Sequence, residues 1–305
     1  MTEFRRAIWD ICAGNAPLSA RQCYYRAVVA GLVAKDTGKS RASEKQVGGA
    51  LDVMREDYVA TFGPRQIQLT ERAVALCREL LLLPFEWVTD NTRTRYQARL
   101  YGDSEDALAD LARTYRRNLW RLQPRHVEVW CESDSIGGVL LNLTDRYGVA
   151  LLPCKGQSSK RFIWDSAQAY ARLGKPVTCL YVGDFDPSGL DIGNSVQERL
   201  ARYSAPDVEF RRIAITPDQV RDMGLPGHGL NPNHPASVRR RFIDVCDDYG
   251  ISGEAVEAEA MPPGDLRDLV EDAIREYIDQ RQWELELAVE AEERAGLERL
   301  TGHAP

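Results

Sequence analysis

The chain has 305 residues, 44% of them hydrophobic, with 39 Lys and Arg against 46 Asp and Glu, so its formal net charge is −7. This composition is typical of a globular protein with a buried core, and no apolar run is long enough to span a membrane. Because the N-terminus lacks an apolar signal core and the seven cysteines form no CxxC pair, we expect a cytoplasmic protein with reduced thiols.

The charges are unevenly distributed along the chain. A negative net charge argues against nucleic-acid binding, because proteins bind DNA largely through cationic contacts to phosphate. The acidic excess, however, lies largely between residues 254 and 298, whereas basic residues gather near the N-terminus. A basic face for DNA therefore remains open in the N-terminal part of the chain.

Residues 1–65 are predicted to form a small helical module. Ser19-Ala-Arg-Gln22 has the pattern of a capping box and predicts a helix that runs to about residue 35. A second such pattern, Ser43-Glu-Lys-Gln46, predicts the start of another helix after a polar break at 36–40. Two short helices joined by a basic turn are typical of a helix-turn-helix or winged-helix module, although a plain helical hairpin fits equally well.

Residues 66–122 are predicted to be a helical connector. The helical pattern is interrupted at Pro84, and a second amphipathic pattern covers residues 103–122.

Residues 123–305 have the alternating pattern of an α/β domain. Strand-like segments at 126–131, 148–154, 176–183 and 208–215 alternate with helical patterns at 133–146, 158–173 and 188–203. This order predicts βαβ crossovers and a parallel sheet flanked by helices, and the lack of polar alternation predicts that both faces of the sheet are covered. A Gly/Pro-rich loop at 224–235 and a helical tail from 265 to about 300 follow.

Three acidic residues follow strands of this predicted sheet. Glu132 comes directly after the first strand, and Asp184 and Asp186 come after the third. Since functional groups in open parallel sheets gather at the carboxyl ends of the strands, we expect the three carboxylates to share one edge. Clustered carboxylates are hard oxygen ligands of the kind that suit Mg²⁺, which predicts metal-assisted phosphoryl chemistry. The simpler alternative is that Glu132 caps a helix and residues 184–189 are an ordinary turn.

The segments VEVWCES (127–133) and LYVGDFDPSGLDI (180–192) resemble the Toprim domain of topoisomerases, primases and related nucleases. In that family a glutamate at the end of a strand and a DxD motif bind Mg²⁺. The resemblance therefore implies a Toprim fold for residues 123–305, with Glu132, Asp184 and Asp186 as metal ligands.

The segment RQCYYR (21–26) resembles the RxxYY element of the A subunit of type IIB topoisomerases and of the related meiotic break-forming protein. CKGQSSKRF (154–162) and VEAEAMPPGDLRDLVEDAIREYI (256–278) are similar to later parts of the same family. The resemblance implies that Tyr25 attacks DNA. It also implies a homodimer, in which the tyrosine of one subunit meets the Toprim site of the other, and a separate ATP-hydrolysing partner, since the chain has no GxxxxGK[ST] loop.

The residue types around Tyr25 agree with a catalytic role. A free phenol has a pKa of about 10, so it needs a nearby cation or metal to act as a nucleophile at neutral pH. Arg21 lies one helical turn before Tyr25 and is predicted to share its face. We therefore expect Arg21 to assist Tyr25, and Glu132 to act both in catalysis and as a metal ligand. The product implied is a 5′-phosphotyrosine link and a free 3′ hydroxyl.

We expect DNA to be bound through its backbone, because nothing in the sequence is typical of base recognition. The candidate phosphate contacts are Lys35, Lys39, Arg41, Lys45, Lys155, Lys160 and Arg161. Two other functions remain open. A Toprim nuclease would cleave with water and leave Tyr25 structural, and a non-catalytic protein would only bind DNA.

Overall fold

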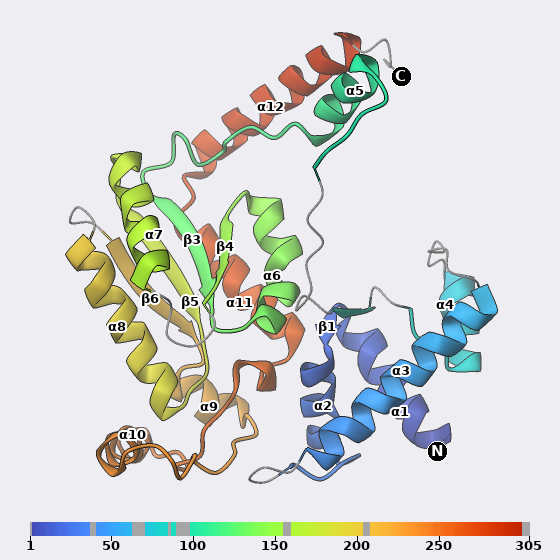
Figure 1. Cartoon of the computed structure of the whole chain (residues 1–305), viewed down its shortest axis with the longest axis vertical. Helices are drawn as coiled ribbons and strands as arrows, with labels where there is room; N and C mark the ends of the chain where they lie inside the picture. The colour runs from blue at the N-terminus through green and yellow to red at the C-terminus, as the bar shows by residue number, and fades with distance from the viewer. Residues whose placement is uncertain are drawn as a thin grey trace.

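The structure is a computed structural model that describes residues 2–36, 41–62, 71–84, 87–89, 98–154, 160–203 and 208–300. Two predicted DNA contacts, Lys39 and Lys155, lie outside these ranges, and the side chain of Lys160 is not described either. The predicted α/β class is confirmed, because the chain contains a parallel sheet flanked by helices (Figure 1). Within the described ranges, no helix has the length and apolar character needed to cross a bilayer.

The central sheet has four strands in the order β4-β3-β5-β6, and each pair of neighbours is parallel. The predicted strands and crossover helices lie where the sequence pattern placed them. They are β3 (His126–Cys131), α6 (Asp134–Tyr147), β4 (Ala150–Pro153), α7 (Lys160–Leu173), β5 (Val177–Val182), α8 (Pro187–Tyr203) and β6 (Val208–Ala214).

Helices cover both faces of this sheet. On one face, Val129 of β3 and Leu180 of β5 belong to a core shared with α6 and α11 (Pro263–Arg275). On the other face, Trp130 and Tyr181 pack with α7 and α8. Figure 1 shows these two helical layers on either side of the strands. The double coverage explains why the strands are apolar without polar alternation.

The N-terminal part packs against the α6 face, since its buried residues belong to the same core cluster. Its elements are α1 (Thr2–Asn15), β1 (Leu18–Ser19), α2 (Ala20–Val29), α3 (Ala42–Phe62), α4 (Glu71–Leu80) and β2 (Val88–Thr89). The guanidinium of Arg26 on α2 donates to the carbonyl of Ala260. That contact joins the N-terminal helices to the C-terminal part of the chain.

One of the two predicted capping boxes is confirmed and the other is wrong. The Ser19 hydroxyl accepts from Gln22 N at 3.1 Å, and the Gln22 side chain accepts from Ser19 N at 2.9 Å. Ser43, in contrast, lies inside α3, which begins at Ala42. The carboxylate of Asp36 accepts hydrogen bonds from the amides of Ser43 and Glu44 at 3.0 and 2.9 Å. The free amides at the N-terminus of α3 are therefore bound by an acid several residues earlier in the sequence.

The predicted helix over 103–122 is shorter than expected. The observed helix α5 covers Ser104–Thr114, and Asp103 caps it. The chain then runs without helix to residue 125. Tertiary contacts explain this end, because Arg117 N donates to Glu290 at 2.8 Å and its guanidinium pairs with Glu286 and, at 2.8 Å, with Glu293.

These glutamates lie on α12 (Gln280–Leu300), beside α5 in Figure 1. The acidic helix is therefore not a simple solvated surface, since Glu286 is buried against Arg117. The predicted helical tail consists of α11 and α12 separated by residues 276–279. Three further elements, α9 (Pro217–Met223), α10 (Ala236–Asp248) and the short 3₁₀ helix η2 (Ala258–Ala260), were not predicted.

Candidate carboxylate and tyrosine site

The predicted carboxylates lie where the strand order of the sheet reverses. From β3 the chain crosses to β4 on one side, and from β5 it crosses to β6 on the other side. The carboxyl ends of β3 and β5 are thus adjacent while the segments that follow them diverge. Ligands of open α/β sheets bind at such a point, and both Glu132 and Asp184 are found there.

Glu132 and Asp184 are in direct contact. The amide of Asp184 donates to Glu132 Oε2 at 2.9 Å, and the Tyr181 hydroxyl approaches the same oxygen at 3.3 Å. The amide of Glu132 donates to Val182 O at 3.0 Å, which continues the β3–β5 pairing to the edge of the sheet. The helix after β3 is capped by Ser133, so Glu132 is not its cap.

Asp186 has a different setting. Its carboxylate accepts a hydrogen bond from the amide of Gly189 in the first turn of α8. The negative charge of Asp186 nevertheless acts on Glu132 and raises the pKa of that carboxyl, after the larger effect of burial. Asp186 thus stabilises a helix terminus and also belongs electrostatically to the carboxylate group.

The electrostatics of this group favour a cation. Burial, and then the neighbouring Glu132 and Glu259 carboxylates, raise the pKa of Asp184 to about 8. The positive charge of Arg212 opposes the negative charge of these carboxylates. Burial lowers the pKa of the Arg212 guanidinium. Carboxylate oxygens are the hard ligands that Mg²⁺ prefers, so the residue types fit this ion. Within the described ranges, no three His, Cys, Asp or Glu side chains are close enough to form a preassembled metal site.

Arg212 holds the turn after β5 in place, a role that the sequence analysis missed. Its guanidinium donates to the carbonyls of Gly183, Asp184, Ile215 and Gly189 at 2.9, 3.2, 3.3 and 2.7 Å. It also lies 4.9 Å from the centre of the Tyr181 ring. The signal in the sequence was a pair of adjacent arginines inside the predicted strand at 208–215.

Gly189 is needed for the same turn. A Cβ added there would clash with the carbonyl oxygen of Asp184. We expect Gly189→Ala to lower the free energy of unfolding by about 1–3 kcal/mol, because backbone must move to relieve the overlap. Urea unfolding measures this, with Gly193→Ala as the control on the same helix, where the nearest atoms are 3.9 Å away. Equal stability of the two variants would contradict the predicted contact.

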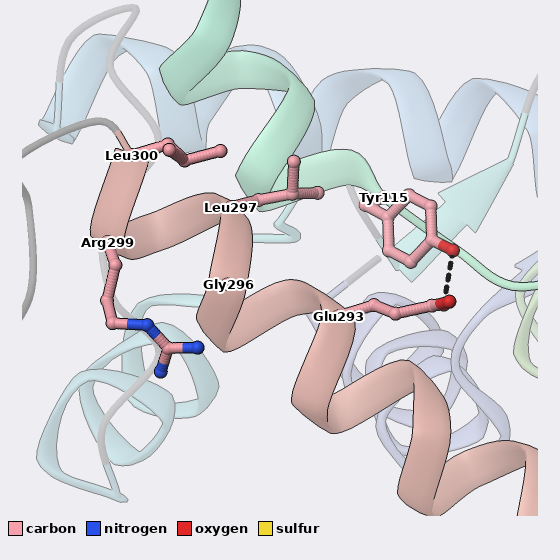
Figure 2. Close-up of a pocket in the computed structure, with 6 residues that line it drawn as sticks. All are labelled: Tyr115, Glu293, Gly296, Leu297, Arg299 and Leu300. Carbon is pink, nitrogen blue, oxygen red and sulfur yellow. Dashed lines mark hydrogen bonds between the residues drawn. The ribbon is translucent and has the colours of Figure 1, made fainter.

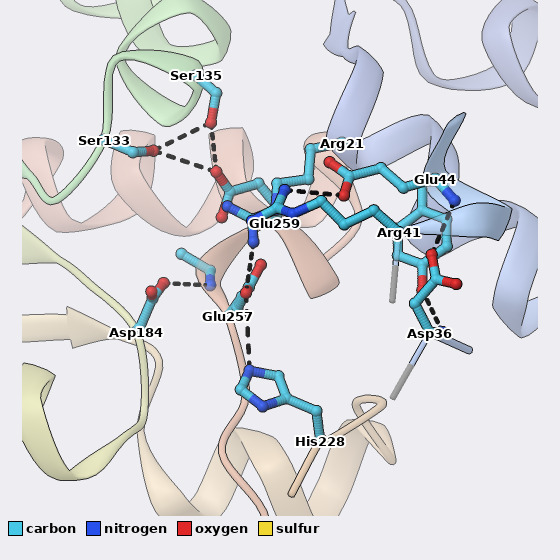
Figure 3. A network of polar contacts seen from close by, with 12 residues as sticks. Arg21, Asp36, Arg41, Glu44, Ser133, Ser135, Asp184, His228, Glu257 and Glu259 are labelled. Atoms are coloured by element: carbon cyan, nitrogen blue, oxygen red, sulfur yellow. Dashed lines mark hydrogen bonds and ion pairs between the residues drawn. The ribbon is translucent and has the colours of Figure 1, made fainter. Parts of the chain in front are cut away.

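A C-terminal segment completes the site and was also missed. Phe185 and Val256 form an antiparallel bridge, with both amide–carbonyl distances 2.8 Å. The amide of Ala258 donates to Asp184 Oδ1 at 2.8 Å. Glu259 is buried and accepts from the hydroxyls of Ser133, at 3.1 Å, and of Ser135 (Figure 3). The alternation of acids and apolar residues in VEAEA was the available signal.

Tyr25 is connected to this segment through Glu257. Only 4% of Tyr25 is exposed, and the Glu257 carboxylate lies close enough to its hydroxyl to raise the pKa of the phenol, after the larger effect of burial. Arg21 reaches Glu257 Oε1 at 2.6 Å and His228 Nε2 lies 3.6 Å from the same oxygen. Figure 3 shows Arg21 and His228 pointing at Glu257 from two sides. The predicted common face of Arg21 and Tyr25 agrees with these contacts.

The setting of Tyr25 does not activate it in this conformation. Burial and the negative charge of Glu257 raise the pKa of the phenol, whereas Arg21 lowers it to a smaller extent. The expected assistance from Arg21 is thus outweighed, because the guanidinium is already bound to Glu257. The phenol is held neutral here.

Some of the predicted DNA contacts line a pocket of about 600 Å³ next to Tyr25. Lys35 and Arg41 lie on its wall, and Arg41 also pairs with Glu44 at 3.0 Å. Lys45 is exposed on α3. Arg161 is exposed on α7, on the other face of the sheet, where it pairs with Asp165 at 2.8 Å. The structure therefore brings Lys35 and Arg41, but not Arg161, to the tyrosine.

A second pocket, of about 560 Å³, lies between α12 and Tyr115, the first residue after α5 (Figure 2). Its polar contact is the Tyr115 hydroxyl, which donates to Glu293 at 2.6 Å. This contact belongs to the packing of the two helices and none of the predicted site residues lines the pocket.

Comparison of the sequence with protein-family models and with curated proteins finds no match. A function for this chain therefore has to be argued from the residue patterns and from the geometry of the site.

Proposed function

We propose that the chain is a Mg²⁺-dependent DNA-cleaving enzyme that resembles the A subunit of type IIB topoisomerases. In this proposal residues 123–305 form a Toprim domain, residues 1–65 a winged-helix-like module and residues 66–122 the connector. The strand order, with acids at the ends of the adjacent strands β3 and β5, supports the Toprim assignment. The packing of α1, α2 and α3 beside the small β1–β2 pair supports the N-terminal one.

The observation that carries the proposal is the link between the carboxylates and the tyrosine. Glu257 contacts Tyr25 and Arg21, and the next residue, Ala258, contacts Asp184. Elements separated by more than 150 residues in the sequence thus meet around one short segment. A nucleophile beside an acidic cluster is the arrangement expected for phosphoryl transfer.

The reaction proposed is transesterification. The Tyr25 oxygen forms a bond to phosphorus, the bond from phosphorus to the 3′ oxygen breaks, and that oxygen takes a proton from water. The phenolic proton leaves to solvent or to a carboxylate in contact with it. One phosphodiester bond is broken and one is formed. Glu132, Asp184 and Asp186 would hold Mg²⁺, which when bound supplies positive charge to the phosphate and the leaving oxygen. Arg21 would orient the phosphate.

DNA is the proposed partner, with Lys35, Lys39, Arg41, Lys45, Lys155, Lys160 and Arg161 as backbone contacts. Their charge predicts binding that weakens steeply with salt. A homodimer and a separate ATPase subunit are also proposed, since the resemblance implies both.

A hydrolytic nuclease is the second candidate, and the burial of Tyr25 favours it. A neutral, buried phenol is a poor nucleophile, so water could attack in its place while Tyr25 keeps a structural role.

The chemistry of the 5′ ends separates the two candidates. Purified protein is incubated with supercoiled plasmid and Mg²⁺, then denatured, and the ends are labelled with and without protease treatment. Transesterification predicts protein attached to 5′ ends and free 3′ hydroxyls. Free 5′ phosphates would support the nuclease instead, and intact plasmid under all conditions would refute both.

A further inference from the structure

Glu257 is the meeting point of donors from two distant parts of the chain. Arg21 on α2 lies 2.6 Å from Glu257 Oε1, His228 in the Gly/Pro-rich loop lies 3.6 Å from the same oxygen, and Tyr25 is beside the carboxylate. The second oxygen, Oε2, is buried without a hydrogen-bond partner among the described residues. The guanidinium, phenol and imidazole around this carboxylate are all groups that can donate to an anion. The three donors together therefore make an anion-binding position.

This position opens onto the pocket of about 600 Å³, whose wall includes Arg21, Tyr25 and His228. Lys35 lines the same pocket, and its Nζ is buried with no hydrogen-bond partner among the described residues. The carboxylates of Glu254 and Glu257 act on the charge of Lys35, and an anion in the pocket would supply a hydrogen-bond acceptor.

Glu257 is an anion in this setting. Burial alone would raise the pKa of its carboxyl, but hydrogen bonding with His228 and the charge of Arg21 hold it below the ordinary value. The carboxylate offers two oxygens with a shared negative charge, as the non-bridging oxygens of a phosphodiester do. Donors arranged for one of these groups can therefore bind the other.

We propose that Arg21, Tyr25 and His228 form the binding position for one phosphodiester of the DNA, and that Glu257 fills this position when no DNA is bound. Glu257 is then an internal competitor that keeps Tyr25 occupied. DNA binding displaces it and places a phosphate directly against the tyrosine oxygen. The idea deepens the proposed function, because it names the phosphate contacts and adds His228 to them.

The proposal explains two features of the site. Tyr25 is neutral because burial, and then the negative charge of Glu257, raise the pKa of its hydroxyl. Lys35 has no hydrogen-bond partner among the described residues, and a phosphate of the DNA in this pocket would supply one.

Binding measured without metal tests the proposal independently of cleavage. The full chain is titrated with a fluorescent DNA duplex in EDTA, so that no reaction occurs. We expect Glu257→Gln to bind about tenfold more tightly than the wild type, which corresponds to about 1.4 kcal/mol. The matched control is Glu254→Gln, which removes the same charge from the wall of the same pocket. It should tighten binding by only about twofold, clearly less than Glu257→Gln does, because Glu254 acts on the charge of Lys35 but is not bound by Arg21 or His228.

Two outcomes of this comparison would overturn the proposal. Binding by Glu257→Gln that is unchanged or weaker would show that the carboxylate does not compete with DNA. Equal tightening by both variants would show a general effect of charge.

A second pair of variants covers the case in which Glu257→Gln does not fold, which thermal unfolding reveals. His228→Ala should weaken duplex binding by about fivefold or more, by loss of a charged hydrogen bond. His234→Ala, in the same loop, should leave binding unchanged. Equal binding by these two variants would remove His228 from the phosphate contacts and overturn the proposal.

The result is separable from the proposed chemistry. If the plasmid ends are free 5′ phosphates but Glu257→Gln binds DNA more tightly, the proposed phosphate position is supported and the proposed transesterification is refuted. If the ends carry tyrosine but Glu257→Gln binds like the wild type, only the phosphate position falls.

Discussion

Tyr25→Phe is expected to abolish covalent protein–DNA adducts, by roughly 10³-fold or more, because it removes the attacking oxygen and nothing else. The ring packing survives, since the Tyr24 and Tyr25 rings lie 5.2 Å apart and both remain aromatic. The loss of one hydrogen bond to Glu257 costs about 1 kcal/mol of stability at most. The adduct is measured after denaturation as the fraction of plasmid DNA that stays attached to protein and is released by protease.

Tyr24→Phe is the matched control for this experiment. The Tyr24 hydroxyl accepts from the amide of Asp36 at 2.8 Å and does not contact Glu257 in the described structure. Removing it should lower stability by about 1 kcal/mol and leave the adduct in place. Undiminished adduct in Tyr25→Phe, or equal loss in both variants, would contradict the assignment of Tyr25.

A mixing experiment then decides whether Tyr25 acts together with the carboxylates of its own chain or with those of the other subunit. Glu257 and Ala258 link Tyr25 and Asp184 within one chain, whereas the family resemblance implies action across a dimer. Tyr25→Phe mixed with Asp184→Asn should regain adduct if the site is shared between subunits, because the mixed dimer holds one intact pair. No recovery from a mixture that forms dimers would place both groups in the same chain.

Asp184→Asn is expected to stabilise the metal-free chain by an amount that grows from about pH 4 to about pH 8, and to abolish DNA cleavage. The folded pKa of Asp184, about 8, is raised from an ordinary value of 3.8, chiefly by burial and then by Glu132. The folded chain therefore holds an extra proton between these values, and stability is lost progressively as the pH rises from about 4 to about 8. The amide variant carries no such charge. Thermal unfolding in EDTA should show a small gain at pH 5 that grows to the full effect, on the order of a few kcal/mol, at pH 9.

Added Mg²⁺ gives the complementary result. The ion should raise the unfolding temperature of the wild type, because a ligand of the folded state stabilises it, and should have a much smaller effect on Asp184→Asn. Asp248→Asn, an exposed acid on α10, serves as the control and should behave like the wild type. An equal Mg²⁺ effect in all three proteins would argue against a metal at this position.

Local patterns in the sequence were sufficient for the central fold. The alternation of apolar segments with helical ones placed β3 to β6 and the helices between them, because period and length are local properties of a chain. The Ser19 capping box was read correctly for the same reason, since the groups involved are three residues apart. The adjacency of Glu132 and Asp184 also followed, since parallel strands bring their carboxyl ends to one edge.

The sequence by itself thus determined the α/β class, the parallel sheet and two of the acids at its edge. Only the tertiary structure decided the parts that depend on distant partners. Arg117 ended a predicted helix by binding α12, Asp36 replaced Ser43 as a cap, and Glu257 joined Tyr25 to the carboxylate edge. Hydrogen bonds and charges act between whichever groups the fold brings together. No local period encodes such pairs, so they appear only when the chain is folded.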